Sequence, residues 1–390
     1  MKRTVTLLMA AALGLSLVGC SGTGSGGGAS ASGDTIKIGV NYELSGTVAT
    51  YGQGSVQGIE MAAEEINAAG GVKGKKIQLV KYDTKSDPAE ATTLATRLIT
   101  QDKVVTVIGP ATSGSFKAEI PVANKNQVPA VSGSATADDV TVSNGKVQEY
   151  AFRTCFNDSF QGTAMATYAA NTLNAKKAVI IKDSSSDYSK GLADNFKTKF
   201  AAAGGQIVGE EAYTTNDQDF NAILTRIKAE QFDVIYLPGY YNEAGLIIKQ
   251  ARALGINAPV LGGDGFDSPQ LKELAGASAL NNVYFTNHYS SLDQDPAVQG
   301  FISAYKQKYN ADPGAFQALG YDTMKFVADA INRASAIDGK SIQQAMASTK
   351  DFKGVTGTFS VDANHNPVKQ IVVISLKNGD QAGSTKVSAS

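Results

Sequence analysis

The stretch from Val104 to Thr136 constrains the fold most strongly, because it repeats a short apolar run followed by a small polar turn. Two β-branched runs, 104–108 and 128–131, have the composition of strands that are buried in a parallel sheet. Small residues follow each run, at 111–114 and at 132–136. In an open α/β sheet, ligands bind beyond the carboxyl ends of the strands. The sequence therefore predicts two ligand-facing turns at one edge of a sheet.

These two turns have the chemistry of an anion site. Backbone N–H groups, hydroxyls and a helix N-terminus together favour a carboxylate without any basic side chain. Neither turn contains a base or a metal ligand, so we expect the site to hold an anion rather than react with it. For either turn alone, an ordinary Ser/Gly-rich loop is the simpler interpretation, and the rest of the chain decides between the two.

The βα pattern occurs twice along the chain, which predicts two lobes. The first array starts at the strand 36–42, and the second runs from the strand 178–181 to the strand 283–285. The expected fold class is therefore α/β, with two doubly wound Rossmann-like lobes joined by a multi-strand hinge. The length of 390 residues agrees with about two domains. Such lobes would face each other across a cleft and close on a ligand by hinge motion.

The expected boundaries follow from this pattern. Lobe 1 comprises 35–154 with 289–366, and lobe 2 comprises 155–288 with 367–380, followed by a flexible tail at 381–390. Within lobe 1, we expect a loop at 43–54.

A helix start is expected at Asp87-Pro88-Ala89-Glu90, with Asp87 as the N-cap and Pro88 at the first helical position.

The N-terminus has the pattern of a processing signal. A short basic segment precedes an apolar stretch at 5–17, which is too short to span a bilayer comfortably. The following Leu17-Val18-Gly19-Cys20 resembles the lipobox of bacterial lipoproteins, which implies cleavage before Cys20 and its lipidation. Residues 1–19 are then a signal peptide and 20–34 a lipidated Gly/Ser tether, which predicts an extracytoplasmic protein anchored to a bacterial cell membrane only by lipid. An ordinary signal peptide cut elsewhere is the alternative.

Composition excludes several classes of function. The formal net charge of −1 provides no basic surface for nucleic acid. Of the two cysteines, Cys20 lies in the processing signal and Cys155 stands alone, so disulfide and zinc sites lack residues. We expect no metal and no cofactor.

Enzymatic interpretations also fail. Tyr51-Gly52-Gln53-Gly54 imitates a dinucleotide-binding fingerprint, but these glycines lie well beyond the end of the first strand at Tyr42. No G-x-S-x-G elbow occurs, and the two histidines, His288 and His365, lie in separate late segments. The sequence therefore favours a binding protein over an enzyme.

Several short motifs, each weak alone, become specific through their order and spacing. They are Leu44-Ser45-Gly46 with Tyr51-Gly52, Ile66-Asn67-Ala68-Ala69-Gly70-Gly71-Val72-Lys73-Gly74, Tyr82-Asp83 with Asp87-Pro88, Ile108-Gly109 with Ser113-Gly114-Ser115, Ser134-Ala135-Thr136, Phe152-Arg153-Thr154, Gly239-Tyr240-Tyr241, Gln250-Ala251-Arg252 and Val355-Thr356-Gly357. Together they resemble the Leu/Ile/Val-binding family of ABC importers, which has the type I periplasmic-binding fold, over nearly all of the mature chain.

The resemblance implies a function. The protein would capture a free amino acid, branched-chain and aliphatic, by lobe closure, and would deliver it to an ABC permease with its ATPase. It would work as a monomer and without a cofactor. Two alternatives stay open at this stage: a sensor of the same fold that signals to a receptor, and a binder of another small amino acid or amide.

The resemblance also implies which residues hold the ligand's charged groups. Ser113 would bind the α-carboxylate through its hydroxyl and N–H. Ser134 would contact the ligand through its backbone, and Thr136 would contact it through its hydroxyl and backbone N–H. Asp264 would take the α-ammonium. The sequence agrees, because Asp264 follows a strand in a Gly-rich turn with no basic neighbour, where an unpaired acid is costly until a cation arrives. The alternative for Asp264 is a turn residue that bonds its own backbone.

Four aromatic residues complete the implied site. Tyr188 and Tyr240 of the second lobe would cover the ligand, and Tyr51 and Phe316 would line its side-chain pocket. The alternatives are surface or core aromatic residues for the two lobe 2 tyrosines and a core residue for Phe316, which heads an apolar helix.

Two departures from the family pattern stand out. Ser86 and Thr112 occupy the positions of a disulfide that is frequent in Gram-negative relatives, so that bridge cannot form here. Asp264 stands where well-known relatives carry Glu, and its shorter arm puts the identity of the ligand in question more than its class.

Overall fold

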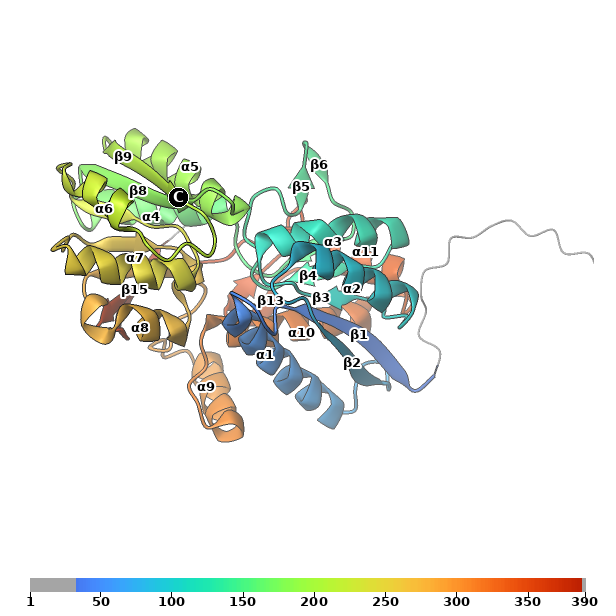
Figure 1. Ribbon diagram of the computed structural model, residues 1–390. Coiled ribbons are helices and arrows are strands. Elements are labelled where there is room, and N and C mark those ends of the chain that lie inside the picture. The colour runs from blue at the N-terminus through green and yellow to red at the C-terminus, as the bar shows by residue number, and fades with distance from the viewer. Residues whose placement is uncertain (1–32, 388–390) are drawn as a thin grey trace, which may run out of the picture.

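Lobe 1 is built on a sheet of five parallel strands in the order β2-β1-β3-β4-β7. The computed structural model describes residues 33–387 and shows α1 and α10 on one side of this sheet and α2 and α3 on the other (Figure 1). The strands are β1 (Thr35–Tyr42), β2 (Lys76–Asp83), β3 (Val107–Ile108), β4 (Ala130–Ser132) and β7 (Ala151–Arg153), and the helices that join them are α1 (Ala49–Ala68), α2 (Pro88–Thr100) and α3 (Ser113–Asn126).

The later part of the chain completes lobe 1. The long helix α10 packs along α1. A small hydrophobic cluster that includes Met61 of α1 joins α9 to α1 and α10. The elements are α9 (Pro296–Tyr309), α10 (Ala315–Arg333), α11 (Gly339–Ala347), and the hairpins β5 (Val142–Ser143) with β6 (Lys146–Val147) and β13 (Phe352–Gly354) with β14 (Gly357–Phe359).

Lobe 2 repeats the strand order of lobe 1 and adds two antiparallel strands at one edge. Its sheet runs β16-β15-β12-β11-β10-β8-β9, with α4 and α5 packed together and α7 packed against α6 and α8. The elements are α4 (Asp158–Asn171), β8 (Lys177–Asp183), α5 (Asp187–Ala202), β9 (Gln206–Tyr213), α6 (Asn221–Lys228), β10 (Val234–Tyr236), α7 (Tyr241–Ala253), β11 (Val260–Gly262), the 3₁₀ turns η1 (Asp264–Phe266) and η2 (Ala277–Ala279), α8 (Pro269–Ala275), β12 (Val283–Asn287), β15 (Ile371–Lys377) and β16 (Asp380–Val387).

The expected α/β fold with two doubly wound lobes is confirmed. The chain crosses between the lobes three times, at 154–157, 288–295 and 360–370. Arg153, which is fully buried, donates hydrogen bonds to the carbonyls of Ala135, Thr136 and Ala137 and from Nε to Asn366 Oδ1 at 2.7 Å. It therefore ties a turn of lobe 1 to the third crossing.

The predicted start of α2 is also confirmed. The Asp87 carboxylate accepts hydrogen bonds from Ala89 N at 2.7 Å and Glu90 N at 3.1 Å. These bonds satisfy two of the N–H groups that have no partner inside the helix.

Two local expectations are wrong. Residues 381–387 are not a flexible tail but form most of β16, an exposed edge strand whose polar sequence lacks an apolar alternation. The loop expected at 43–54 ends early, because α1 begins at Ala49. Gly52 lies inside that helix. A Cβ there would be 2.1 Å from the carbonyl oxygen of Glu43, so close packing and not a turn requires glycine at this position.

The N-terminal predictions fall on residues that lie outside the described part of the chain. These are the signal peptide at 1–19, the tether up to residue 32 and the lipidation of Cys20, together with the tail residues 388–390. No helix within 33–387 has both the length and the apolar character that crossing a bilayer requires.

The contact between α1 and α10 generates a stability prediction. A Cβ at Gly58 would lie 2.0 Å from the carbonyl oxygen of Gln317, so Gly58→Ala must push the two helices apart. We expect a loss of about 1–3 kcal/mol or more in the free energy of unfolding, measured by urea denaturation. Gly300→Ala in α9 is the control, because a Cβ there meets open space. This variant should be more stable than wild type by less than about 1 kcal/mol. Equal effects at both sites would contradict the close-packing argument.

Candidate ligand-binding site

The carboxyl ends of the strands in the two lobes enclose a small cavity. Its volume is only about 10 Å³, so the two lobes leave little free space between them. Larger hollows exist, such as one beside α8, but they lie outside the cleft and do not face both lobes' strand ends. The residues that line the central cavity are Tyr51, Ala111, Thr112, Ser113, Ser134, Tyr188, Tyr240, Asp264, Gly265 and Phe316.

All but one of the residues predicted for the site therefore line this cavity. The exception is Thr136, which is fully buried behind it. Its hydroxyl lies beside the buried Asp158 carboxyl and opposes the rise that burial causes in the pKa of that group, so Asp158 competes with any ligand for this donor. The roles given to these residues remain predictions, because their placement alone does not establish what they bind.

On the lobe 1 side, Glu43 occupies part of the predicted anion site. Its buried carboxylate accepts hydrogen bonds from Ala111 N at 2.9 Å, Thr112 N at 3.1 Å and Thr112 Oγ1 at 2.8 Å. Burial raises the pKa of Glu43, and these three donors oppose that rise. The N–H groups of the first turn are thus not all free, contrary to the sequence-based expectation.

Ser113 retains donors for a ligand. Its Oγ accepts a hydrogen bond from Ala137 N at 3.1 Å, so the hydroxyl proton is available to a second acceptor. Ser113 is also the first residue of α3, where backbone N–H groups lack partners inside the helix. Ser134, by contrast, uses its hydroxyl internally and donates to Ala111 O at 2.9 Å. An anion in the cavity would therefore find its donors at Ser113, with Thr136 behind.

Ser86 and Thr112, which occupy the positions of a disulfide in some relatives, form hydrogen bonds instead. Ser86 Oγ donates to Ser45 O at 2.8 Å, and Thr112 is held by Glu43. Since Glu43 and Ser45 are two residues apart, the same short segment fixes both loops.

On the lobe 2 side, Asp264 is buried and hydrogen-bonded through its carboxylate and its backbone N–H. Its Oδ1 accepts a hydrogen bond from the Tyr188 hydroxyl at 2.8 Å, and its Oδ2 lies 3.0 Å from His288 Nε2. The backbone N–H of Asp264 donates to Gln161 Oε1 at 2.7 Å. The expectation that Asp264 has no basic neighbour is wrong, because the hinge brings back a residue that lies 24 positions away in sequence.

His288 is one of two residues beside the cavity that the sequence interpretation missed. Burial lowers the pKa of His288, while Asp264 raises it, so we assign a neutral ring that donates from Nε2. A signal existed, since His288 directly follows β12 and therefore lies at the carboxyl end of a parallel strand, as Asp264 follows β11. Glu43 was missed although it follows β1 in the same way.

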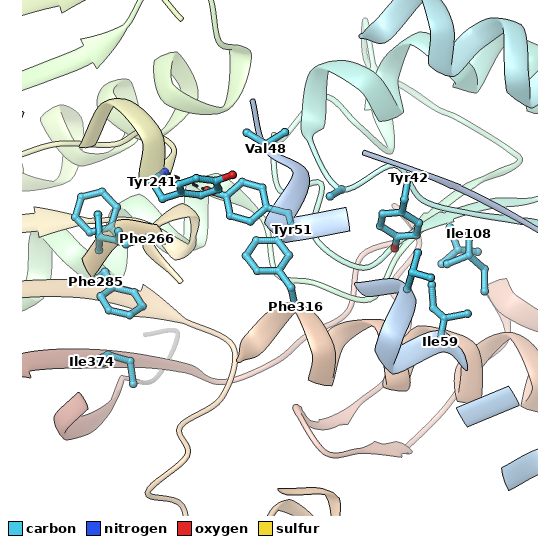
Figure 2. Packing of buried hydrophobic residues seen from close by; sticks show 14 of the residues in the cluster. Tyr42, Val48, Tyr51, Ile59, Ile108, Tyr241, Phe266, Phe285, Phe316 and Ile374 are labelled. Carbon is cyan, nitrogen blue, oxygen red and sulfur yellow. Dashed lines mark hydrogen bonds between the residues drawn. The ribbon is translucent and has the colours of Figure 1, made fainter. Parts of the chain in front are cut away.

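Aromatic rings form the walls of the cavity. Tyr51 stacks on Phe316 with ring centroids 4.2 Å apart and meets Tyr240 edge-on, while Tyr188 stacks on Tyr240 at 5.1 Å. Figure 2 shows Tyr51 of lobe 1 between Phe316 and the lobe 2 residue Tyr241. The side-chain end of the cavity is therefore apolar.

The same residues hold the lobes together. The Tyr51 hydroxyl donates to Gly265 O and accepts from Tyr241 N, and the Tyr241 hydroxyl donates to Thr47 O at 3.0 Å. At the opposite rim, Lys117 of α3 lies 2.7 Å from the Asp187 carboxylate of α5. These contacts describe lobes that are closed over the cavity.

Comparison with known proteins agrees with this architecture. Residues 35–381 match the family described as periplasmic binding protein. This chain belongs to that family. The binding protein is 33% identical over 332 residues to the Leu/Ile/Val-binding protein homolog 3 of Brucella melitensis, which covers 85% of this chain and 88% of the relative.

Solved structures of relatives share the fold of this periplasmic binding protein. The substrate-binding protein LivJ of Streptococcus pneumoniae, in complex with isoleucine, is 44% identical with a TM-score of 0.86, over 90% of this chain and 99% of that one. The leucine binding protein LivK of Thermotoga maritima is 37% identical with a TM-score of 0.86, over 91% and 99% of the two chains. Within residues 33–387, no three His, Cys, Asp or Glu side chains are grouped to hold a metal ion.

The role of Glu43 generates a second prediction. In Glu43→Gln, an amide N–H₂ replaces one acceptor oxygen, so at least one of the three buried donors loses its partner. We expect a loss of about 1–3 kcal/mol in the free energy of unfolding, measured by urea denaturation. The exposed Glu230 is the matched control, and Glu230→Gln should change stability by less than about 0.5 kcal/mol. Wild-type stability in Glu43→Gln would mean that Glu43 does not hold the turn.

Proposed function

We propose that this binding protein captures a free branched-chain aliphatic amino acid (leucine, isoleucine or valine) by lobe closure. The observation that carries the proposal is the opposition of charges across one small cavity. A buried carboxylate at Asp264 faces the donors of Ser113 and the N-terminus of α3, with aromatic rings between them. An α-amino acid zwitterion matches this arrangement at both of its charged ends.

Each end of the ligand would have a defined partner. The ammonium would bind Asp264, whose two oxygens each retain a lone pair beside the bonds from Tyr188 and His288. The carboxylate would bind Ser113 and Thr136. Hydrogen bonds to charged groups contribute roughly 1.5–3 kcal/mol each, so these contacts would supply much of the affinity.

The side chain of the ligand would pack against Tyr51 and Phe316. Their stacked rings are buried, which suits an aliphatic group better than a charged one. The names of the relatives support this class of ligand, because they include a Leu/Ile/Val-binding protein and a structure that holds isoleucine.

Delivery to an ABC permease and its ATPase is the second part of the proposal. It is supported by the family and by the lipobox-like Leu17-Val18-Gly19-Cys20, which would keep an extracytoplasmic protein at the bacterial membrane. The protein would deliver its ligand without any covalent change, so the proposed function is transport and not catalysis.

Calorimetric titration of the refolded, ligand-stripped chain 21–390 against the twenty amino acids tests the ligand class. We expect micromolar or tighter binding of leucine, isoleucine and valine. Their affinities should lie within about 10–200-fold of one another, because one methylene in an apolar pocket discriminates weakly. Tight binding of a different amino acid or an amide would correct the side-chain pocket, and no binding to any would favour the sensor alternative.

The role of Asp264 is tested with a variant and a modified ligand. Asp264→Asn should weaken leucine binding by about 2–5 kcal/mol, because the ligand ammonium loses its buried counter-charge. The same variant should bind 4-methylpentanoate, which is leucine without its ammonium, at least as well as wild type does. Asp219→Asn, at an exposed carboxylate of lobe 2, should leave both affinities unchanged. Wild-type affinity for leucine in Asp264→Asn would refute the assignment of the ammonium site.

A further inference from the structure

His288 occupies a position that joins the ligand site to the hinge. It directly follows β12 at the start of the second crossing, and it is only 4% exposed. Its ring stacks on Phe156 of the first crossing, with centroids 3.7 Å apart and planes inclined by 14°. Nε2 of the same ring lies 3.0 Å from Asp264 Oδ2. Two crossings therefore hold this ring on one side, and Asp264 lies on the other.

The contact leaves Asp264 little freedom. The Tyr188 hydroxyl donates to Oδ1 of Asp264 and accepts a hydrogen bond from Gly265 N at 3.0 Å. Because His288 contacts Oδ2, both oxygens of the carboxylate bond to rings that are themselves fixed. A carboxylate side chain in water would rotate freely about its own bonds. Here its orientation toward the cavity depends on two donors, of which only His288 can change its charge near neutral pH.

The other nitrogen of the ring is also informative. Nδ1 of His288 is buried and has no hydrogen-bond partner among the described residues. Because Nε2 donates to Asp264, Nδ1 is the atom that would take up a proton. His288 also lines a hollow behind the hinge, together with Asp293, Gln370 and Lys386, whereas Asp264 lines the ligand cavity. The ring thus forms part of the wall between the two spaces.

The charged groups around His288 come from several elements. Asp264 of η1 favours a protonated ring, and Lys369 of the third crossing opposes it. Burial lowers the pKa of Lys369 to about 8, so this lysine is mostly charged below that pH. Asp158 of α4 lies near enough to Asp264 to interact with it electrostatically, and burial holds its pKa well above the usual range. Burial and Lys369 thus oppose protonation of the His288 ring, and Asp264 favours it.

We infer that His288 is a positioning residue, which as a neutral donor aims Asp264 at the ligand's ammonium and which, once protonated, competes with that ammonium and releases the ligand. The inference rests on the proposed function, because it concerns the regulation of the same site. Linkage gives the sign of the pH dependence. The ligand's ammonium at Asp264 disfavours a second positive charge beside it, so affinity falls as pH falls through the pKa of His288 in the ligand-free protein.

The first test compares leucine affinity from pH 4.5 to 8 in wild type, His288→Gln, His288→Ala and His365→Gln. His365 is a matched control, since it is also buried and stacks on a phenylalanine, Phe152, but contacts the Ala151 carbonyl instead of Asp264. Asp158 and the other buried carboxyl groups are present in every variant. Differences between the pH profiles therefore isolate His288.

Wild type and His365→Gln should lose affinity by about tenfold per pH unit below the titration of His288, as one linked proton requires. His288→Gln should lack this component, and at pH 7.5 its amide donor should keep leucine affinity within about fivefold of wild type. His288→Ala should bind at least about tenfold more weakly at pH 7.5, since Asp264 loses a donor. A wild-type pH profile in His288→Gln, or wild-type affinity in His288→Ala, would overturn the inference.

The second test does not depend on a variant of His288 that folds. The chain has two histidines, so ¹⁵N-detected NMR of the imidazoles resolves both, and His365→Gln assigns them. Wild type should show a neutral ring protonated at Nε2 at pH 7 and a lower His288 pKa after leucine is added. A charged ring at pH 7, or a pKa that leucine does not move, would overturn the inference. Failure of wild type to bind any amino acid at any pH would instead refute the proposed function.

Discussion

A carboxylate buried where two lobes meet is the constraint on which the rest of this structure depends. Asp264 is 3% exposed, and removing such a charge from water is costly unless hydrogen bonds replace the lost hydration. The replacements come from Tyr188 on α5 and His288 in the hinge, while Gln161 on α4 accepts a hydrogen bond from the backbone N–H of Asp264. The helices and the hinge must therefore all be in place before the acid can be accommodated. An ammonium bound at Asp264, as proposed, would enter an environment that the fold has already prepared.

Tyr51 couples the shape of the cavity to the closure of the lobes. Its ring forms the apolar wall with Phe316, while its hydroxyl bonds the backbone of lobe 2 at Gly265 and Tyr241. In Figure 2 the packed aromatic residues continue from lobe 1 into lobe 2 through this side chain. A ligand that shifts the ring disturbs the interlobe bonds as well. If Tyr51 lines the side-chain pocket as proposed, this one residue would both select the ligand's side chain and stabilise the closed form.

Local sequence patterns predicted the elements whose signals lie within a few residues, such as the strand that became β1 and the helix start at Asp87. They failed where packing between distant segments decides the outcome. Gly52 was assigned to a loop, although it lies in α1 and is glycine because the Glu43 backbone packs against it. β16 forms because β15 offers it a partner, and its own polar sequence gives no sign of a strand. His288 and Glu43 act on residues 24 and 68 or 69 positions away, which no local pattern records.

The hinge acts on both ends of the candidate site. Arg153 bonds the carbonyls of Ala135, Thr136 and Ala137 and also Asn366 in the third crossing, so the turn that presents Ser134 and Thr136 depends on the hinge. His288 connects the hinge to Asp264 in the same manner. A rotation of the lobes must therefore alter the turn at 134–136 and the surroundings of Asp264 together. Because a ligand shifts a conformational equilibrium only through its different affinity for the two states, this shared dependence links binding directly to closure.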